Sequence, residues 1–269
     1  QRPQQLARAL ADMGSVVYFV EPPSLSGSDT LEASEFENNI FRIKPWGAKP
    51  EITGACLRAL AEMAPDAAWL VHYPRWVPLL RQHIEEQRTV IYDCMDWWSE
   101  FPDATWKISA WENELAASAD FVLASAVPLY TRMKLLNPST VYMANAVYED
   151  DYASALPEAG DLHNIPRPRL LFVGSVEDWV DLDLVKFLAE SRPEWSIVMV
   201  GPSSIPANRL PSLPNIYWLG KRPYEQLSAY MHHCDIGLIP FKQNRLTRGV
   251  NPLKVHEYVA CGLPVVSTF

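Results

Sequence analysis

The sequence predicts an α/β fold in which parallel sheets form two doubly wound domains. Short apolar segments alternate with helical patterns along the whole chain. Most of these segments are continuously apolar, which is typical of strands covered by helices on both faces. The 269 residues exceed one typical domain, and a charged, proline-rich break lies past the middle of the chain. These three observations favour two domains over one.

The predicted strands are the segments 16–20, 39–45, 68–73, 89–95, 120–126 and 140–146, followed by 169–175, 196–202, 215–220, 236–241 and 264–268. Helical patterns lie between them. The first helix closes at Gly14, which suits a helix C-terminus. A later helix over 223–234 places Leu227, Tyr230, Met231 and Cys234 on one apolar face.

The break covers residues 149–169, which are acidic, then rich in proline, and carry no sustained period. We interpret this segment as the link between domains spanning 1–160 and 161–269. Both ends look truncated, because the chain opens with a helix where such domains usually open with a strand. The last predicted strand, 264–268, has no helix after it to cover the sheet.

Composition excludes several classes of protein. The net charge of -9 argues against general nucleic-acid binding, and no apolar stretch is long enough to span a membrane. The four cysteines are far apart and form no CxxC pair, so we expect free thiols in a reducing compartment, the cytoplasm. The chain has no GxGxxG and no GxxxxGK[ST] motif, so neither a dehydrogenase nor a P-loop enzyme is indicated.

The charges divide unevenly along the chain. Up to Pro166 there are 12 Lys and Arg against 23 Asp and Glu, whereas from Arg167 onward there are 11 against 9. The basic residues concentrate between Lys221 and Lys254. This pattern indicates either a site for a small anion or a solvated basic face.

The segment 244–268 predicts a helix over 252–261 just before a buried strand. Asn251 is a good N-cap, Pro252 suits the first helical position, and Gly262 suits the position after the C-cap. Lys254 lies in the first turn, where the helix dipole disfavours a cation. A bound anion at the helix N-terminus would explain this placement.

Two further side chains belong to this prediction. Arg248 precedes the helix and could share the charge of a diphosphate, and Glu257 lies one turn past Lys254 on the same side. A carboxylate there can accept hydrogen bonds from a vicinal diol, so the segment favours a nucleotide. The alternative is an ordinary capped surface helix with a Lys–Glu pair.

An acidic loop follows the strand 89–95. It carries Asp93, Asp96, Glu100 and Asp103, with Trp97 and Trp98 among them. Ligands bind beyond the carboxyl ends of strands in open α/β sheets. A carboxylate at this position, ionised at neutral pH, could act as a general base on a sugar hydroxyl. The alternative is a helix-capping loop in which Asp96 or Ser99 is the cap.

Weaker candidates remain. The run from His232 to Asp235 could suggest a metal site, but adjacent helix positions point in different directions. His72 sits at another strand end and could line a cleft or simply pack. The segment 74–83 has the Arg, Trp and Leu character of a surface that touches a membrane or a lipid-linked acceptor, or it is ordinary domain surface.

The segment NPLKVHEYVACGLPVVST resembles the nucleotide-binding helix of bacterial GT-B glycosyltransferases, the glycosyltransferase 1/4-like group. Further segments are similar to that group in the same order, namely QRPQQLARALADMGSVVYFVEPP, VIYDCMDWWSEF, ADFVLASAVPLYTRM and PRLLFVGSVEDWVDLDLV. The resemblance covers nearly the whole chain. It implies two Rossmann-like domains facing each other across a cleft.

The resemblance also implies the activity, which is transfer of a sugar from a nucleoside-diphosphate sugar to a saccharide or lipid-linked saccharide, as in envelope polysaccharide assembly. UDP or GDP is the expected nucleotide, with no metal and no separate cofactor, at the cytoplasmic side of a membrane. Asp96 matches the base of inverting relatives, with Asp93 as second choice. The implied nucleotide contacts are Glu257, Lys254, Arg248, Asn251, Pro252, Gly174 and Arg222.

Three positions depart from the family pattern. Gly249 replaces the first of two glutamates, the segment SVEDWVDLD is acidic where many relatives carry Arg or Lys, and Ala146 replaces a glycine. Because of these departures, we expect Arg248, Lys254 and Arg222 to supply the positive charge that neutralises the diphosphate. They also keep two alternatives open, a catalytically silent nucleotide-sugar-binding protein and a nucleotide-sugar epimerase on the same fold.

Overall fold

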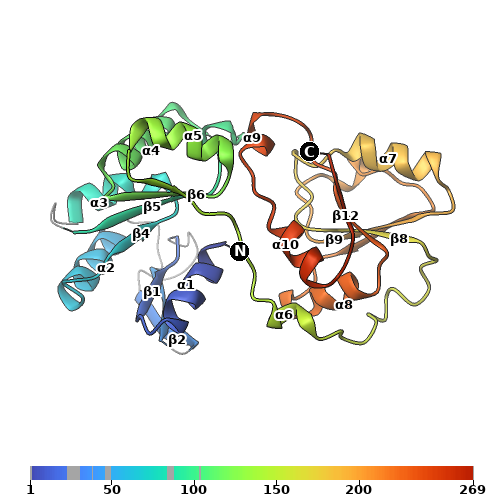
Figure 1. Ribbon diagram of the computed structural model, residues 1–269, viewed down its shortest axis with the longest axis horizontal. Coiled ribbons are helices and arrows are strands. Elements are labelled where there is room, and N and C mark those ends of the chain that lie inside the picture. The colour runs from blue at the N-terminus through green and yellow to red at the C-terminus, as the bar shows by residue number, and fades with distance from the viewer. Residues whose placement is uncertain are drawn as a thin grey trace. The chain divides into compact units, whose positions relative to one another are not determined.

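A computed structural model describes residues 2–22, 31–37, 39–45, 50–83, 88–102 and 104–268. The chain divides into two compact units, each described below by itself (Figure 1). The N-terminal unit comprises Gln1–Ala144 with Gly249–Asn251, and the C-terminal unit comprises Asn145–Arg248 with Pro252–Phe269. None of the helices in the described ranges combines the length and hydropathy that crossing a membrane requires.

The N-terminal unit holds two sheets. The first has the order β1-β3-β2, from β1 (Val17–Val20), β2 (Leu31–Glu37) and β3 (Ile40–Pro45). The second has the order β4-β5-β6-β7 and is parallel throughout, from β4 (Trp69–Val71), β5 (Val90–Cys94), β6 (Phe121–Ala124) and β7 (Thr140–Tyr142). The helices are α1 (Arg2–Asp12), α2 (Pro50–Met63), α3 (Val77–His83), α4 (Trp106–Ser118) and α5 (Val127–Leu136), with 3-10 turns η1 (Pro74–Trp76) and η2 (Trp98–Glu100).

The core beneath the second sheet fixes where β5 ends. Tyr92 and Cys94 of β5 are fully buried and pack with residues of the two helices that follow, including Leu115 of α4 and Leu129 and Met133 of α5. The strand therefore ends inside the unit. The residues that follow β5 emerge at the edge where the carboxyl ends of the parallel strands lie.

The C-terminal unit has one parallel sheet of order β10-β9-β8-β11-β12. Its strands are β8 (Arg169–Val173), β9 (Ser196–Val200), β10 (Ile216–Gly220), β11 (Ile236–Ile239) and β12 (Val265–Ser267). Its helices are α6 (Asp150–Ala153), α7 (Leu182–Ser191), α8 (Leu227–His232), α9 (Arg245–Arg248) and α10 (Leu253–Ala260), with 3-10 turns η3 (Ala207–Arg209) and η4 (Tyr224–Gln226). The strand order reverses between β8 and β11, so the carboxyl end of β8 is the switch point where ligands bind in such sheets.

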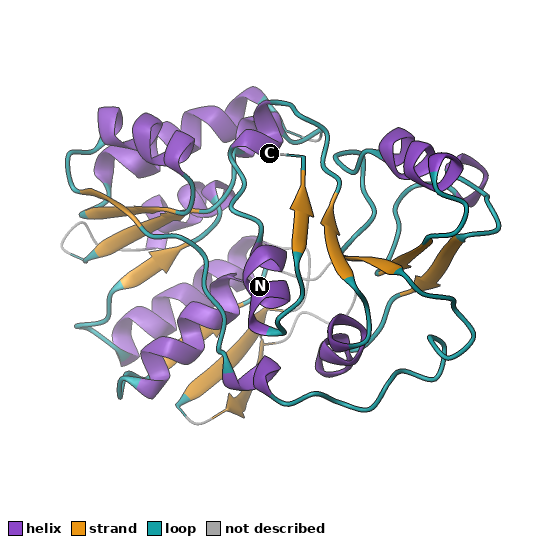
Figure 2. Cartoon of the chain, turned by 45° about the vertical axis from the view of Figure 1, so that its right-hand side comes forward, coloured by secondary structure: helices purple, strands orange, loops and turns teal. Residues whose placement is uncertain are grey.

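Both faces of this sheet are buried. Along β8, Leu171 and Val173 face one core cluster with α8 and α10, whereas Leu170 and Phe172 face a second cluster with α7. The alternation follows the two-residue period of a strand. Figures 1 and 2 show α7 on one side of the strands and α8 and α10 on the other. The prediction of doubly wound parallel architecture is confirmed for this unit.

Every predicted strand is present, but the sequence missed β2. This strand pairs antiparallel with β3, so the first sheet is mixed rather than parallel. Its sequence, LEASEFE, carries three glutamates and lacks the continuous apolar character by which the other strands were found. An exposed edge strand needs only one partner, and polar side chains suit it.

The segment 149–169 is not a free link. Tyr152, Leu162 and Ile165 are buried in the core that β8, α8 and α10 share, and Arg169 donates hydrogen bonds to the carbonyls of Leu162 and Ile165 at 2.7 and 2.8 Å. The division between the units accordingly falls after Ala144, before the predicted boundary of 160/161. These three buried side chains are spaced along a polar segment with neither helical nor strand periodicity, so the sequence does not indicate their burial.

Candidate functional site

Two glycines shape the switch point of the C-terminal sheet. Gly174 follows β8 directly, and its N–H donates to the carbonyl of Val200 at 2.9 Å. Gly201, with φ of 146°, lies so close that a Cβ there would stand 1.9 Å from the Gly174 oxygen. The turns after β8 and β9 therefore touch through bare backbone, a surface that a phosphate can approach closely. The sequence predicted Gly174 but not Gly201.

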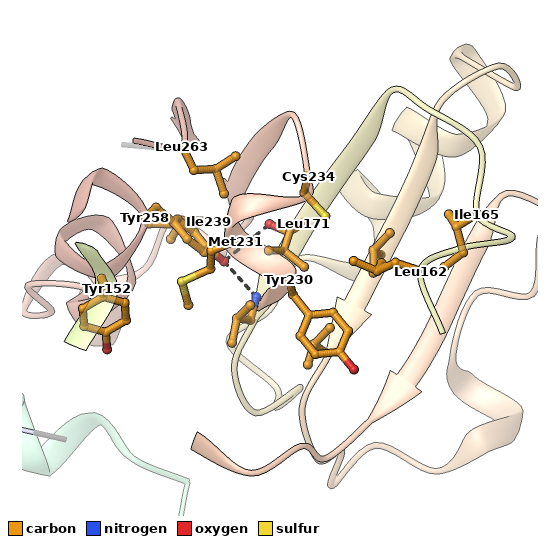
Figure 3. Packing of buried hydrophobic residues seen from close by; sticks show 13 residues of the cluster. Tyr152, Leu162, Ile165, Leu171, Tyr230, Met231, Cys234, Ile239, Tyr258 and Leu263 are labelled. Carbon is orange, nitrogen blue, oxygen red and sulfur yellow. Dashed lines mark hydrogen bonds between the residues drawn. The ribbon is translucent and has the colours of Figure 1, made fainter. Parts of the chain in front are cut away.

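Helix α10 is fixed to the same sheet by Tyr258. This side chain is fully buried, and its hydroxyl accepts the Val173 N–H at 2.8 Å and donates to the Leu171 carbonyl at 3.4 Å (Figure 3). A Cβ on Gly237 of β11 would stand 2.5 Å from the Tyr258 ring, so glycine is required there. These contacts set where the first turn of α10 lies relative to β8.

Glu257 and Lys254 form the polar centre of α10. The Lys254 ammonium pairs with Oε2 of Glu257, which confirms that the two side chains share one side of the helix. Glu257 is fully buried, and its Oε1 has no hydrogen-bond partner among the described residues. Burying a carboxylate oxygen without a partner is costly, and a hydrogen bond donated by a ligand hydroxyl would offset that cost.

Tyr152 is a neighbour of this carboxylate that sequence reasoning missed. Its hydroxyl is hydrogen-bonded to the hydroxyl of Tyr224. Burial, followed by the negative charge of Glu257, raises the pKa of Tyr152, so the phenol stays protonated. The Tyr152 hydroxyl therefore lies near the Glu257 carboxylate. Since Tyr152 and Glu257 are far apart in the chain, no local pattern links them.

The start of α10 differs from the prediction. Pro252 has extended backbone angles and is itself the N-cap, without a side-chain cap bond, and the helix runs from Leu253 to Ala260. Asn251 is therefore one residue too early to be the N-cap, and it belongs to the N-terminal unit. The predicted end is confirmed, because Gly262 has φ of 69° directly after the C-cap. The first N–H groups of α10 lack a side-chain cap at the N-cap position.

The two predicted arginines differ in their surroundings. Arg222 forms an ion pair with Asp161 at 2.7 Å, and its Nε donates to the Tyr230 hydroxyl at 3.0 Å. Its charge is thus compensated within the unit. Arg248 ends the short helix α9 and is exposed. Of the two, Arg248 is better placed to supply positive charge to a ligand.

Asp93 of the N-terminal unit is held by the side chains of Arg2 and His72. Its carboxylate is fully buried and accepts three hydrogen bonds from Arg2, at 2.7 to 2.9 Å, and contacts His72 Nδ1 at 2.9 Å. Burial alone would raise the pKa of Asp93, but the hydrogen bonds from His72 and Arg2 outweigh it and leave the pKa below its ordinary value. This geometry favours an orienting role for Asp93 over proton transfer with a substrate.

Asp96 lies two residues beyond β5, between the strand and η2. Burial and the nearby Asp93 charge raise the pKa of Asp96 to about 7. The expectation of an ordinary, fully ionised aspartate is therefore wrong. A pKa near the working pH suits a general base, because it balances the ionised fraction against basicity. The N-cap of η2 is Trp97, without a side-chain cap bond, so neither Asp96 nor Ser99 caps it.

The run from His232 to Asp235 does not converge on one point. His232 and His233 bind two different backbone carbonyls, those of Tyr152 and Leu156, rather than one shared point. In the part of the chain that the structure describes, no three His, Cys, Asp or Glu side chains gather as metal ligands would. Metal-independent chemistry stays a prediction. Asp103 of the acidic loop lies outside the described residues.

Comparison with known proteins agrees with this geometry. Residues 167–269 match the family described as Glycosyl transferases group 1. The putative teichuronic acid biosynthesis glycosyltransferase TuaH of Bacillus subtilis (strain 168) is 31% identical over 201 residues, which cover 66% of this chain and 50% of TuaH. The chain thus spans about half the length of this curated relative.

Solved structures share the fold at low identity. A structure described as trehalose-6-phosphate from E. coli bound with UDP-2-fluoro glucose has a TM-score of 0.66 and 13% identity, covering 98% of this chain and 80% of that one. Anabaena Alr3699/HepE in complex with UDP and glucose has a TM-score of 0.61 and 15% identity, covering 84% and 66%. Residues 167–269 are thus similar to the glycosyl transferases group 1 family, and nearly the whole length of the chain has the GT-B fold.

Proposed function

We propose that this protein transfers a sugar from a nucleoside-diphosphate sugar to an acceptor hydroxyl. The observation that carries the proposal is the carboxylate of Glu257. It is buried in the family-matched helix beside the switch point, and one of its oxygens lacks a partner among the described residues. A ribose diol would supply that partner, since its hydroxyls can donate to the carboxylate.

The diphosphate would lie at the N-terminus of α10 and the turn after β8. Lys254 and Arg248 supply positive charge, and the N–H groups at the start of α10, where Pro252 provides no side-chain cap, supply donors. Gly174 and Gly201 leave the backbone open to close approach. This set of donors can neutralise a leaving diphosphate. UDP is the first nucleotide to test, because the E. coli and Anabaena proteins of the same fold hold UDP-containing ligands.

The acceptor side rests on Asp96. In an inverting reaction the acceptor oxygen attacks the anomeric carbon, the bond from that carbon to the diphosphate oxygen breaks, and the hydroxyl proton passes to Asp96. Asp93 would orient Arg2 and His72 rather than take a proton, since its carboxylate is hydrogen-bonded to both side chains. In a retaining reaction the donor phosphate would take the proton instead, and Asp96 would not be required.

We also place the activity in the assembly of a cell-envelope polysaccharide, at the cytoplasmic side of the membrane. TuaH, the relative that is 31% identical, carries a teichuronic acid biosynthesis name. The acceptor would then be a saccharide or a lipid-linked saccharide. The described cysteines are free thiols, which fits a reducing compartment.

A thermal-shift panel of UDP, GDP, ADP and dTDP tests the donor site directly. A nucleotide at 100 times its dissociation constant stabilises the folded protein by about 2.7 kcal/mol. We expect one nucleotide to shift the wild type and to lose its effect in Glu257→Ala. Binding without hydrolysis or transfer by the full-length protein would favour a silent binding protein, and isomerised donor without acceptor would favour an epimerase. No shift with any nucleotide would refute the proposal.

A further inference from the structure

An aromatic pocket lies in the N-terminal unit, beyond the carboxyl ends of β4 and β5. It has a volume of about 200 Å³ and is lined by Tyr73, Arg75, Trp98, Phe101, Ala104 and Ile108. The Trp98 ring packs against Tyr73 with centroids 4.7 Å apart and against Phe101 at 5.5 Å. The nucleotide contacts proposed above all lie elsewhere in the chain, so this pocket has no assigned role.

The size of the pocket limits its ligand. Sites for drug-sized molecules occupy about 300–1,000 Å³. A pocket of about 200 Å³ therefore suits a single ring rather than a whole nucleotide. Its walls are largely aromatic, and the negative faces of aromatic rings attract the weakly positive C–H groups of a sugar ring.

One polar group in the wall needs a partner. The indole N–H of Trp98 is buried and has no hydrogen-bond partner among the described residues. Leaving a buried donor unpaired is costly, so a ligand that offers an oxygen acceptor is favoured over a purely apolar one. Arg75 holds its guanidinium 5.5 Å from the centre of the Tyr73 ring, which disfavours a cationic ligand.

We propose that this pocket binds the pyranose ring of the saccharide acceptor, with a sugar oxygen accepting the Trp98 indole N–H. The inference deepens the proposed function and rests on it for the identity of the ligand as the acceptor. The loop that carries Trp98 also carries Asp96, two residues earlier. A ring held by Trp98 would therefore sit on the same loop as the proposed base.

The test observes the indole N–H directly in protein labelled with ¹⁵N-tryptophan. The Trp98 resonance is assigned by its loss in Trp98→Phe. Methyl glucoside, glucuronate and N-acetylglucosamine are then titrated to about 100 mM, so that binding with a dissociation constant as weak as ~1 mM is close to saturation. Glycerol serves as a polyol without a ring. We expect at least one saccharide, but not glycerol, to shift the Trp98 resonance.

Two tryptophans serve as internal controls. The Trp69 indole N–H is also buried without a described partner but does not line the pocket, and that of Trp218 donates to the Pro211 carbonyl at 3.1 Å. Both should stay unmoved when Trp98 shifts. A Trp98 resonance that never moves, or that moves only together with Trp69, overturns the proposal. The surviving resonances of Trp98→Phe report whether that variant is folded.

A kinetic comparison links the pocket to transfer. Trp98→Phe keeps a ring but removes the donor, so the acceptor KM should rise about 3- to 10-fold, as expected for one lost hydrogen bond. Trp106→Phe is the matched control: Trp106 is 77% exposed and does not line the pocket, so this variant should leave the acceptor KM unchanged. An unchanged acceptor KM in Trp98→Phe would also overturn the proposal.

The nucleotide panel on the same samples separates the two ideas. Nucleotide binding without any saccharide effect on Trp98 refutes the pocket alone. A Trp98 shift without any nucleotide binding refutes the proposed function and leaves the pocket as a saccharide site.

Discussion

Removing the ammonium of Lys254 should destabilise the C-terminal unit through Glu257 rather than through Lys254 itself. The carboxylate is fully buried, one of its oxygens has no described hydrogen-bond partner, and the other is paired with Lys254. In Lys254→Met the charge of Glu257 remains buried without its counter-ion. Glu257→Gln removes that charge and keeps the shape of the side chain.

The magnitude follows from the unequal burial of the pair. Breaking a buried ion pair by removing one partner costs about 3–5 kcal/mol. Because the Lys254 side chain is 23% exposed and water reaches it, we expect the lower end, about 3 kcal/mol. The double variant Lys254→Met/Glu257→Gln has no stranded charge, so it should recover most of the loss and give a coupling energy of about 2 kcal/mol.

Urea unfolding of the wild type, the two single variants and the double variant completes the cycle. Tryptophan fluorescence and circular dichroism should be followed together, because two units need not unfold in one transition. Lys186→Met is the matched control, since its ion pair with Glu190 is exposed at both ends and should matter by less than about 1 kcal/mol. If Lys254→Met is as stable as the wild type, or the double variant is no better than Lys254→Met, the reasoning about Glu257 is refuted.

Three further predictions concern Asp96 and the glycine contact. Asp96→Asn should lower turnover about 10²–10⁴-fold with unchanged nucleotide affinity, measured by steady-state rates and titration; near-native turnover would favour a retaining mechanism. Because the folded pKa of Asp96 is raised to about 7, the folded state holds a proton that the unfolded state releases near pH 4. Stability should therefore fall as pH rises from about 4 to 7, and Asp96→Asn should flatten that slope; an unchanged slope contradicts the raised pKa. Gly201→Ala should cost about 3 kcal/mol or more in urea unfolding, since its Cβ meets the Gly174 oxygen at 1.9 Å. Gly220→Ala, with positive φ but open space, should cost only about 1–2 kcal/mol, and equal losses would discredit the steric argument.

Features set by local pattern were predictable from the sequence. The strands of the C-terminal sheet are continuously apolar because both faces are covered, and Gly262 ends α10 because that position has positive φ. The placement of Lys254 and Glu257 on one side of a helix follows from helical spacing alone. These parts of the fold and of the candidate site need no knowledge of distant contacts.

Features that depend on distant residues were not predictable. Asp93 owes its buried charge to Arg2, which is 91 residues away, and no pattern in the acidic loop announces a cationic partner. Asp96 looks like an ordinary aspartate until the fold buries it beside Asp93. Gly201 resembles any turn glycine, because only the packed sheet brings its backbone against Gly174. Such contacts exist only after the chain has folded.

The two hydrogen bonds of the Tyr258 hydroxyl have a consequence for how ligands are received. A slide of α10 along the sheet by one turn would break both bonds and move the ring out of the space beside Gly237 that only a glycine leaves open. The helix is therefore preorganised, and a ligand at its first turn need not offset the entropy of ordering a mobile segment. The Val173 amide, which donates to this hydroxyl, should exchange its hydrogen slowly, at a rate that reports opening of the whole unit. Ligand binding should leave that rate limited by global unfolding rather than by movement of the helix.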